Sequence, residues 1–480
     1  MGCYMKRLSL GFSILLILAV FALSSCSGLP NNGGGGGGGG TGTGNVIVTV
    51  TSTPSQTFFF PFLDWQISSV QLINGTGGAV TIVQGSLPPV EFARLQSDSQ
   101  FLGKSLSPIP AGTYASAKIQ LAPSTVSSYF FNSTNATLLG CAAGAVCAIP
   151  STVPGFGAAT ITVPVSFTVT ANSSTGFSLN FDLSKAVTSA SGMTFDFTQS
   201  GAITLSTLPR TGQSSGLDSL ENFTGIISAK GTTSIDMFSL SSDTRTFTMA
   251  ATVQFDDPFS ICTAPANFAC LAVNQNVSVD AVVNSDGTLT AYEVEFLDKS
   301  GQEAEGIIVT PVSSNQFKMV VTSGVGNNSF LPGTLATVTV NSASTYSVDP
   351  KNLFSTTPPA GFQSSSDLVV GQTVMLLNGS TDFTTNTLSG YTRTLLRYST
   401  IGGTVQAPSG TIFTLTGVSP FLTNLSSNSV QVQTFPNTTY DNITGFSGLT
   451  TGANVSVRGL YLNPNSGVTQ PILAAQVRAH

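Results

Sequence analysis

The stretch LVVGQTV at residues 368–374 decides the fold, because the chain holds two further versions of it. These are LAVNQNV at 271–277 and LTTGANV at 449–455, and all three place Leu first, Asn or Gly fourth and Val seventh. A turn and a final strand-like segment follow each version. The pattern is weak in any one copy, but its threefold recurrence indicates an internal repeat.

Each copy also has a similar opening, which sets the length of the repeat. The openings are Gly225-Ile226-Ile227, Gly306-Ile307-Ile308 and Gly403-Thr404-Val405. From the opening Gly to the matched Leu there are 46 residues in the first and third copies (225 to 271, 403 to 449) and 62 in the second (306 to 368). We therefore expect repeats at 222–299, 303–399 and 400–480, the second with an insertion around Pro350–Phe362.

These openings, matched stretches and final strands resemble an uncharacterised bacterial family of small OB-like β-barrels, often found in tandem. The resemblance covers about residues 222–480. It implies three tandem barrels of five or six strands each and a setting in the cell envelope. That family has no established activity and no catalytic residues that could be transferred to this chain.

The segment before the repeats, residues 45–208, also has a strand pattern. Apolar residues alternate in NVIVTVTS at 45–52 and in FSLNFDLS at 177–184, as expected for strands with one buried face. Turn pairs separate such runs along the chain, at Asn74-Gly75, Asp286-Gly287 and Asn378-Gly379. One segment, LDSLENF at 217–223, is compatible with one or two helical turns instead.

Residues Pro110–Tyr114 look like the P-x-G-x-Y turn that enters a late strand in many immunoglobulin-like sandwiches. The whole segment resembles an uncharacterised domain found at the N-terminus of bacterial envelope lipoproteins. We therefore predict an all-β protein, with one β-sandwich-like domain at 45–208, a linker at 209–221 and the three tandem small OB-like β-barrels.

The N-terminus has the pattern of an export signal. Lys6 and Arg7 precede an apolar run at 8–23, which is shorter than the roughly 20 residues a membrane-spanning helix needs. Leu23-Ser24-Ser25-Cys26 resembles the bacterial lipoprotein lipobox. The resemblance implies a lipoprotein signal peptide at 1–25, cleavage before Cys26, and lipidation of Cys26 with acyl chains such as palmitate as a membrane anchor.

Residues 26–44 then form a glycine-rich tether, since polyglycine cannot bury enough surface to offset its chain entropy. Ser27 is not aspartate, and by resemblance to lipoprotein sorting this favours the outer membrane of a two-membrane bacterium. An ordinary signal peptide with an incidental cysteine is the alternative.

Charge and cysteine content limit the partners. Only 8% of residues are charged and the net charge is −6, with no basic patch, so nucleic acid is not an expected partner. Two cysteine pairs remain besides Cys3 and Cys26: Cys141 with Cys147, and Cys262 with Cys270. In an exported chain each pair predicts a local disulfide. The metal alternative lacks histidine partners and C-x-x-C spacing.

Histidine is almost absent, which argues against most catalytic sites. The one histidine is His480, the last residue, so a Ser-His-Asp triad, a His metal site or a His base would have to use a frayed terminus. The pentapeptide at 212–216 matches G-x-S-x-G, but it follows Pro209 at a domain boundary and is interpreted as linker. We predict no catalytic residues, no metal and no cofactor.

Acidic residues gather in two places, Asp256-Asp257 and the group Glu293, Glu295, Asp298, Glu303 and Glu305. Paired carboxylates serve glycoside hydrolysis or bind Ca²⁺, but no D-x-D-x-D-G loop is present. The favoured interpretation is an ordinary solvent-exposed strand edge. The sequence leaves Ca²⁺ binding open.

Aromatic residues gather in FFFPFLDW at 58–65. Phe60, Phe62 and Trp65 are assigned to the sandwich core, with a ligand-binding surface as the alternative. Because OB-like barrels offer grooves for oligosaccharides, we expect a non-catalytic cell-envelope lipoprotein with a binding or structural role. Its expected partner is polysaccharide, cell-wall material or an envelope protein. A carboxylate-dependent glycan-active enzyme and a purely structural spacer remain the alternatives.

Overall fold

The computed structural model describes residues 42–480 except 86, 123–125, 157–158, 189–191, 212–215, 240–242, 259, 264, 298–302, 326–329, 349–352, 354–359 and 426. The predicted signal peptide, Cys26 and the tether up to residue 41 lie outside the described residues. Residues 40–480 form one compact unit. The prediction of an all-β protein is confirmed, because the one described α-helix is the four-residue α1 (Leu183–Ala186) and the other helical turns are short 3₁₀ segments.

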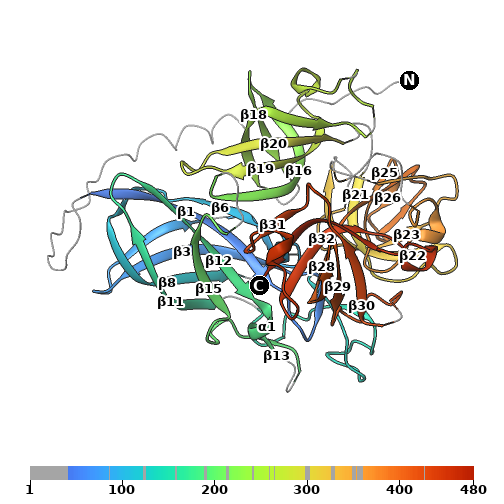
Figure 1. The fold of residues 1–480 in the computed structure, drawn as a ribbon, viewed down its shortest axis with the longest axis horizontal. Helices are drawn as coiled ribbons and strands as arrows, with labels where there is room; N and C mark the ends of the chain where they lie inside the picture. The colour runs from blue at the N-terminus through green and yellow to red at the C-terminus, as the bar shows by residue number, and fades with distance from the viewer. Residues whose placement is uncertain are drawn as a thin grey trace, which may run out of the picture. The chain divides into compact units, whose positions relative to one another are not determined.

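Two sheets form the N-terminal part and enclose one core, as predicted for a sandwich (Figure 1). The first sheet is ordered β15-β12-β1-β6, with β1 at Thr43–Thr53, β6 at Gln100–Lys104, β12 at Ser174–Asp182 and β15 at Ile203–Leu208. The second is ordered β11-β8-β3-β4, with β3 at Asp64–Asn74, β4 at Ala79–Gln84, β8 at Gly112–Ala122 and β11 at Ala159–Val169. Val48 of β1 and Phe177 of β12 both lie in that core.

Shorter strands complete this part. A three-stranded sheet joins β2 (Phe59–Phe62), β9 (Tyr129–Phe131) and β10 (Val146–Ala148). The two-residue strands are β5 (Val90–Glu91), β7 (Ile109–Pro110), β13 (Val187–Thr188) and β14 (Thr194–Phe195). The turn at Pro110–Tyr114 enters β8, and the Tyr114 hydroxyl donates a 2.8 Å hydrogen bond to the Pro110 carbonyl. Gly112 has φ +150°, which favours glycine there.

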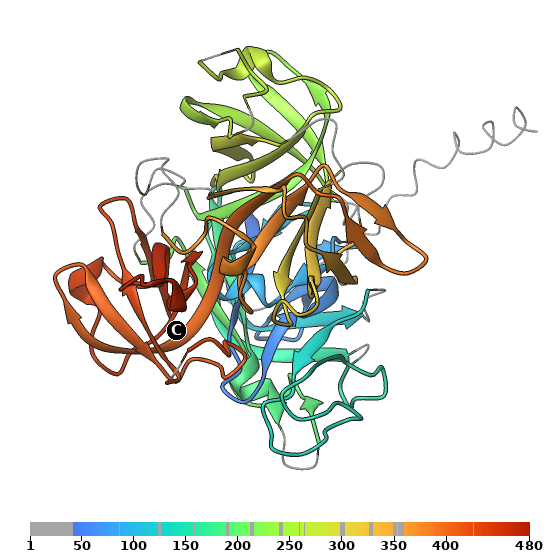
Figure 2. The same ribbon diagram turned by 90° about the vertical axis from the view of Figure 1, so that its right-hand side faces the viewer.

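The first repeat is a closed five-stranded barrel, yellow-green in Figure 2. Its strands are β16 (Asp218–Lys230), β17 (Ser234–Phe238), β18 (Thr244–Asp256), β19 (Asn276–Val283) and β20 (Leu289–Phe296). They close in the order β16-β17-β18-β20-β19, with β18 and β20 parallel.

Residues 217–223 do not form the helical turns with which their sequence is compatible. Residue 217 lies in a bend and residues 218–223 belong to β16. Leu220 pairs with Ala281 of β19 and is buried. The register then shifts before Phe223, and Asn222 takes φ 53° in the bulge. Pairing with a strand some 60 residues away decides the structure of this segment, since tertiary context overrides weak local preference.

The remaining strands form one continuous sheet of 13 strands. They are β21 (Glu303–Ile308), β22 (Gln316–Val325), β23 (Leu335–Thr339), β24 (Thr345–Val348), β25 (Thr373–Leu377), β26 (Ser380–Asp382), β27 (Thr387–Ser389), β28 (Arg393–Ser409), β29 (Ile412–Thr416), β30 (Ser429–Gln433), β31 (Thr439–Asp441), β32 (Asn454–Tyr461) and β33 (Ile472–Ala479). The 17-residue β28 pairs with β24 and β25 through its first part and with β29 and β32 through its second. The predicted boundary between residues 399 and 400 therefore falls inside one strand.

The three repeats share one strand register. The opening glycines pair with the matched valines in each copy, as Gly225 with Val277, Gly306 with Val374 and Gly403 with Val455. A 3₁₀ turn precedes each matched Leu: η2 (Phe268–Cys270), η3 (Ser365–Asp367) and η4 (Phe446–Gly448).

The fourth residue of each matched stretch has a positive φ, which explains why it is Asn or Gly. The values are 67° at Asn274, 93° at Gly371 and 92° at Gly452. Side chains other than those of Asn and Asp rarely adopt this left-handed conformation. The amide of this residue donates back to the opening strand in each copy, to the carbonyls of Ile227, Ile308 and Val405.

Candidate functional site

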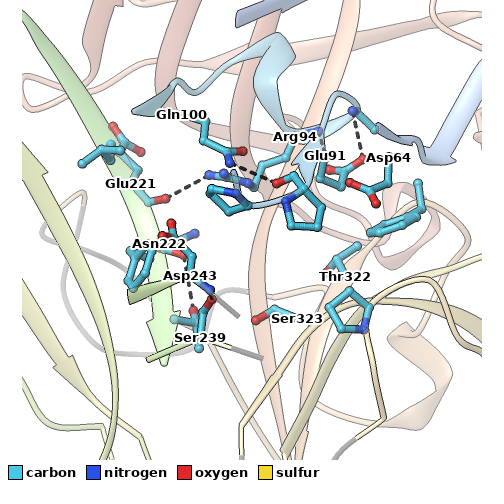
Figure 3. Close-up of a pocket in the computed structure, with 18 of the residues that line it drawn as sticks. Asp64, Glu91, Arg94, Gln100, Glu221, Asn222, Ser239, Asp243, Thr322 and Ser323 are labelled. Atoms are coloured by element: carbon cyan, nitrogen blue, oxygen red, sulfur yellow. Dashed lines mark hydrogen bonds between the residues drawn. The ribbon is translucent and has the colours of Figure 1, made fainter. Parts of the chain in front are cut away.

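The described residues form a cavity of about 630 Å³ (Figure 3). Its lining includes three stretches of the N-terminal sheets (β2, the Leu87–Arg94 segment and β6), β16 of the first barrel, and β21 and β22 of the second repeat. Thr400 and Arg458 of the third repeat also line it. This volume lies within the range of roughly 300–1,000 Å³ that small-molecule sites occupy.

One part of the lining is apolar. Phe59 stacks on Phe421 with 4.3 Å between the ring centres, so Phe421 supports one face of the Phe59 ring. Phe62, Phe101 and Phe223 also contribute to this part of the wall. Leu331 lines the cavity although 59% of its surface is exposed, which is unusual for a large apolar side chain in the described part of the chain.

Two glutamines hold the neighbouring segment of the wall, Leu87–Pro89. The Gln66 amide donates to the Leu87 carbonyl and the Gln100 amide to the Pro89 carbonyl, each at 3.0 Å. Pro88 and Pro89 thus present rigid ring faces to the cavity. These two hydrogen bonds hold the Leu87–Pro89 segment of the wall in place.

Glu91 is the carboxylate most tightly held by the backbone. It accepts from the amides of Leu63 and Ala93 at 2.9 Å and of Arg94 at 2.7 Å. Burial raises the pKa of Glu91, and these hydrogen bonds with the Arg94 charge oppose the rise. The carboxylate therefore shapes the turn into the 3₁₀ segment η1 (Arg94–Gln96).

Three further carboxylates of the wall are paired with arginines. Asp243 accepts from Arg245 at 2.9 Å, and Glu305 accepts from Arg397 at 3.2 Å. Glu221 pairs with Arg458, whose guanidinium also lies 5.3 Å from the centre of the Tyr398 ring. The charges of these three carboxylates are thus compensated within the protein.

Behind the cavity lies a buried network of arginines. Arg478 donates to the carbonyls of Leu95 at 3.0 Å and Asp98 at 2.6 Å, and to Asp441 at 2.6 Å. Arg210 donates to both oxygens of Asp441 at 3.2 Å and pairs with Asp218. This network joins the N-terminal sheets, β16 and β33 of the third repeat.

Sequence reasoning missed this network. The arginines lie far apart in the chain, so spacing alone could not bring them together. The sequence signal that could have indicated buried arginines is the apolar residues next to them in the chain, as in SVRGL at 456–460 and QVRAH at 476–480. An arginine at a buried strand position needs a carboxylate partner.

The predicted acidic group is not a solvent-exposed edge. Glu293 is 8% and Glu295 1% exposed, and Arg397 donates to both oxygens of Glu295 at 2.6 Å. Arg397 brings Glu295 and Glu305 together and compensates the charge of the buried Glu295. Asp298 lies outside the described residues, and nothing is described of the Glu303 side chain.

The second predicted cluster has a local role. The Asp257 carboxylate accepts from the amides of Ile261 at 2.9 Å and Cys262 at 2.7 Å, so it holds the loop that the second disulfide closes. Asp256 ends β18. Within the described ranges, no group of three or more His, Cys, Asp or Glu side chains is arranged to hold a metal ion.

The predicted aromatic residues divide between core and cavity. Trp65 is fully buried and lies edge-on to Phe92, Phe195 and Phe197 in the sandwich core, so the ligand-surface alternative does not apply to it. Phe60 and Phe62 are each 2% exposed and line the cavity.

Both predicted disulfides are confirmed. Cys141 and Cys147 are joined with 5.8 Å between Cα atoms, and Cys262 and Cys270 with 5.6 Å.

His480 is not frayed, contrary to expectation. Its ring nitrogens lie 2.7 Å from the Ser456 hydroxyl and 3.3 Å from the Thr53 hydroxyl. Ser456 is fully buried, and a hydroxyl stands where a triad would place a carboxylate, so the pair is structural. Residues 212–215 of the G-x-S-x-G match lie outside the described residues.

Comparison with known proteins finds a family model that matches one part of the chain. Residues 224–295, nearly the whole first barrel, match a domain of unknown function, DUF5666. The chain has no match among curated proteins. In the part of the chain that the structure describes, no helix has the length and apolar character needed to cross a membrane.

Proposed function

We propose that this protein is a non-catalytic lipoprotein of the cell envelope that binds its partner through the cavity at the junction of the N-terminal sheets and the first two barrels. The observation that carries the proposal is the preformed wall, in which rigid aromatic and proline rings face polar groups (Figure 3). Polysaccharide, cell-wall material and an envelope protein are the partners it fits. The acidic balance speaks against nucleic acid.

Binding is favoured over catalysis by how the carboxylates are used. A glycoside hydrolase needs one carboxyl group as acid and a second as base or nucleophile. Here Glu91 is occupied by three backbone amides, and Glu221, Asp243 and Glu305 are paired with arginines. Proton transfer by any of these groups would first have to break a strong existing interaction.

The lipid anchor at Cys26 is tested by substitution. If the anchor exists, Cys26→Ala leaves the protein unprocessed or releases it from the membrane fraction, and acyl labelling disappears. Membrane fractionation with labelled palmitate measures both effects, with Cys3→Ala as the matched control that keeps them. A Cys26→Ala protein that stays acyl-labelled in the membrane contradicts the lipobox.

Protease treatment of intact cells then tests the site of action. Digestion of the 45–480 body supports capture of external polysaccharide or adhesion at the cell surface. Protection until the outer membrane is opened supports a cell-wall or envelope-assembly partner. Digestion only after cell lysis would place the body inside the cell and overturn the envelope proposal.

A further inference from the structure

Most of the charged side chains that line the cavity are paired within the protein. Arg245 and Arg458 contact carboxylates of the same wall, Asp243 and Glu221. Arg94 pairs with Asp98 and donates to the Glu221 carbonyl at 3.2 Å. A charged ligand would have to break such pairs and leave one partner uncompensated, which is costly at a partly buried site.

Neutral hydrogen-bonding groups remain around the cavity. Ser323 makes no side-chain hydrogen bond to any other described residue and points into the space that Figure 3 shows, opposite Gln100. The Thr322 hydroxyl borders the same space and donates a 3.4 Å hydrogen bond to the Glu305 carbonyl. Hydroxyl and amide groups are suitable partners for ligand hydroxyls.

The cavity also has an apolar side. Phe59, Pro88, Pro89 and the exposed Leu331 all line the cavity. A large exposed apolar side chain at the edge of a pocket is typical of a binding surface. A ligand that fits must therefore combine apolar C–H faces with many hydroxyl groups and carry no charge.

We propose that the cavity binds an uncharged oligosaccharide segment, an inference that rests on the proposed binding function. Sugar rings have C–H faces that pack on Phe59 and the prolines, and their hydroxyls match the Ser323 hydroxyl. Acidic and amino sugars are disfavoured, since most ionic groups of the wall are already paired within the protein.

The test is calorimetric titration of the full-length protein in detergent micelles. The uncharged probes are maltohexaose, cellohexaose and N-acetylchitohexaose, and the charged probes are oligogalacturonate and a chitosan oligomer. We expect an uncharged probe to bind, with an affinity that changes less than about twofold between about 50 and about 500 mM NaCl, because no ionic contact is screened.

Two matched variants locate the binding. Leu331→Ser removes an exposed apolar side chain at the cavity and should weaken binding about five- to tenfold. Leu106→Ser removes one of similar exposure (72%) that does not line the cavity, and should leave the affinity unchanged. Equal affinities in the two variants would overturn the site.

The remaining outcomes separate this inference from the proposed function. Binding confined to a charged probe, and weakened by Leu331→Ser, overturns the uncharged ligand but supports binding through the cavity. If no probe binds, the inference fails, and the proposed function is decided by cross-linking in intact cells. Loss of a cross-linked neighbour in Leu331→Ser but not in Leu106→Ser keeps that function, and no difference between them overturns it.

Discussion

Charged side chains are scarce in this protein, and most of its arginines are used inside it. In the part of the chain that the structure describes, the arginines that form ion pairs with carboxylates include Arg94, Arg210, Arg245, Arg397, Arg458 and Arg478. A planar guanidinium supports such sites because it makes several directed hydrogen bonds and keeps its charge. Serine, threonine and asparagine supply much of the polarity elsewhere.

Arg397 provides the clearest test at this scale, since its side chain is fully buried between Glu295 and Glu305. Arg397→Met leaves Glu295 as an uncompensated buried charge and should lower the free energy of unfolding by about 3–5 kcal/mol. Urea unfolding measures the change.

The control is Lys318→Met, because Lys318 is exposed; we expect a change within about 0.5 kcal/mol. Adding Glu295→Met to Arg397→Met should recover part of the loss. Equal stability of Arg397→Met and the control would show that the ion pair contributes nothing.

At the scale of elements, the sequence predicted what depends on near neighbours along the chain. The alternation in β1 and β12, the Asn74-Gly75 hairpin turn and the repeat with its Asn or Gly at the fourth position are local patterns, so they could be read directly. The structure of residues 217–223 depends on pairing with β19, so it could not be predicted from the local sequence. The length of β28 could not be predicted either, because the sequence of a single strand carries no local sign that two repeats share it.

Substitution of the opening glycines tests the strand register that the three repeats share. A Cβ at Gly225 would lie 2.6 Å from the Phe238 carbonyl oxygen, and one at Gly403 would lie 2.9 Å from that of Thr416. Gly225→Ala should therefore destabilise the protein by roughly 1–3 kcal/mol, and more than Gly403→Ala, because a backbone strand must move. Thermal unfolding measures both.

The matched control is Gly75→Ala, whose Cβ would meet no atom within 4 Å. It should change stability little. A cost at Gly75 as large as at Gly225 would point to loss of chain flexibility rather than to close strand approach.

At the scale of the whole molecule, the cavity and the arginine network are built from residues that the sequence separates widely. Phe59, Gln100, Glu221 and Ser323 line one space. Sequence reasoning singled out Phe60, Phe62 and Glu305 of this wall, since aromatic and acidic clusters are visible locally. It could not place them in one site, because the contacts arise only when the sheets and barrels pack together.

The network predicts how acid affects stability. Burial opposes ionisation of Asp441, but Arg478 and Arg210 together hold the pKa of Asp441 below its ordinary value. A pKa lower in the folded than in the unfolded state gives stability that is present above about pH 4 and is lost as pH falls through the folded pKa. Asp441→Asn should therefore be less stable than wild type at pH 7, and the difference should shrink as the pH falls below about 4.

Urea midpoints measured for both proteins across this range check the prediction. Other carboxyl groups titrate in both proteins, so the comparison isolates Asp441. A difference between the two that stays constant with pH would show that the ionised carboxylate is not what stabilises the network.

The long strand β28 also has a consequence for ancestry. Its first part pairs with β24 and β25 of the second repeat and its second part with β29 and β32 of the third. A gene duplication or deletion that copied or removed only one of these two repeats would leave the other without part of a shared strand. New copies can be accepted between β20 and β21, where the first barrel is already closed. We therefore expect residues 303–480 to be inherited as a pair, and related proteins to differ in repeat number by steps that keep this pair whole.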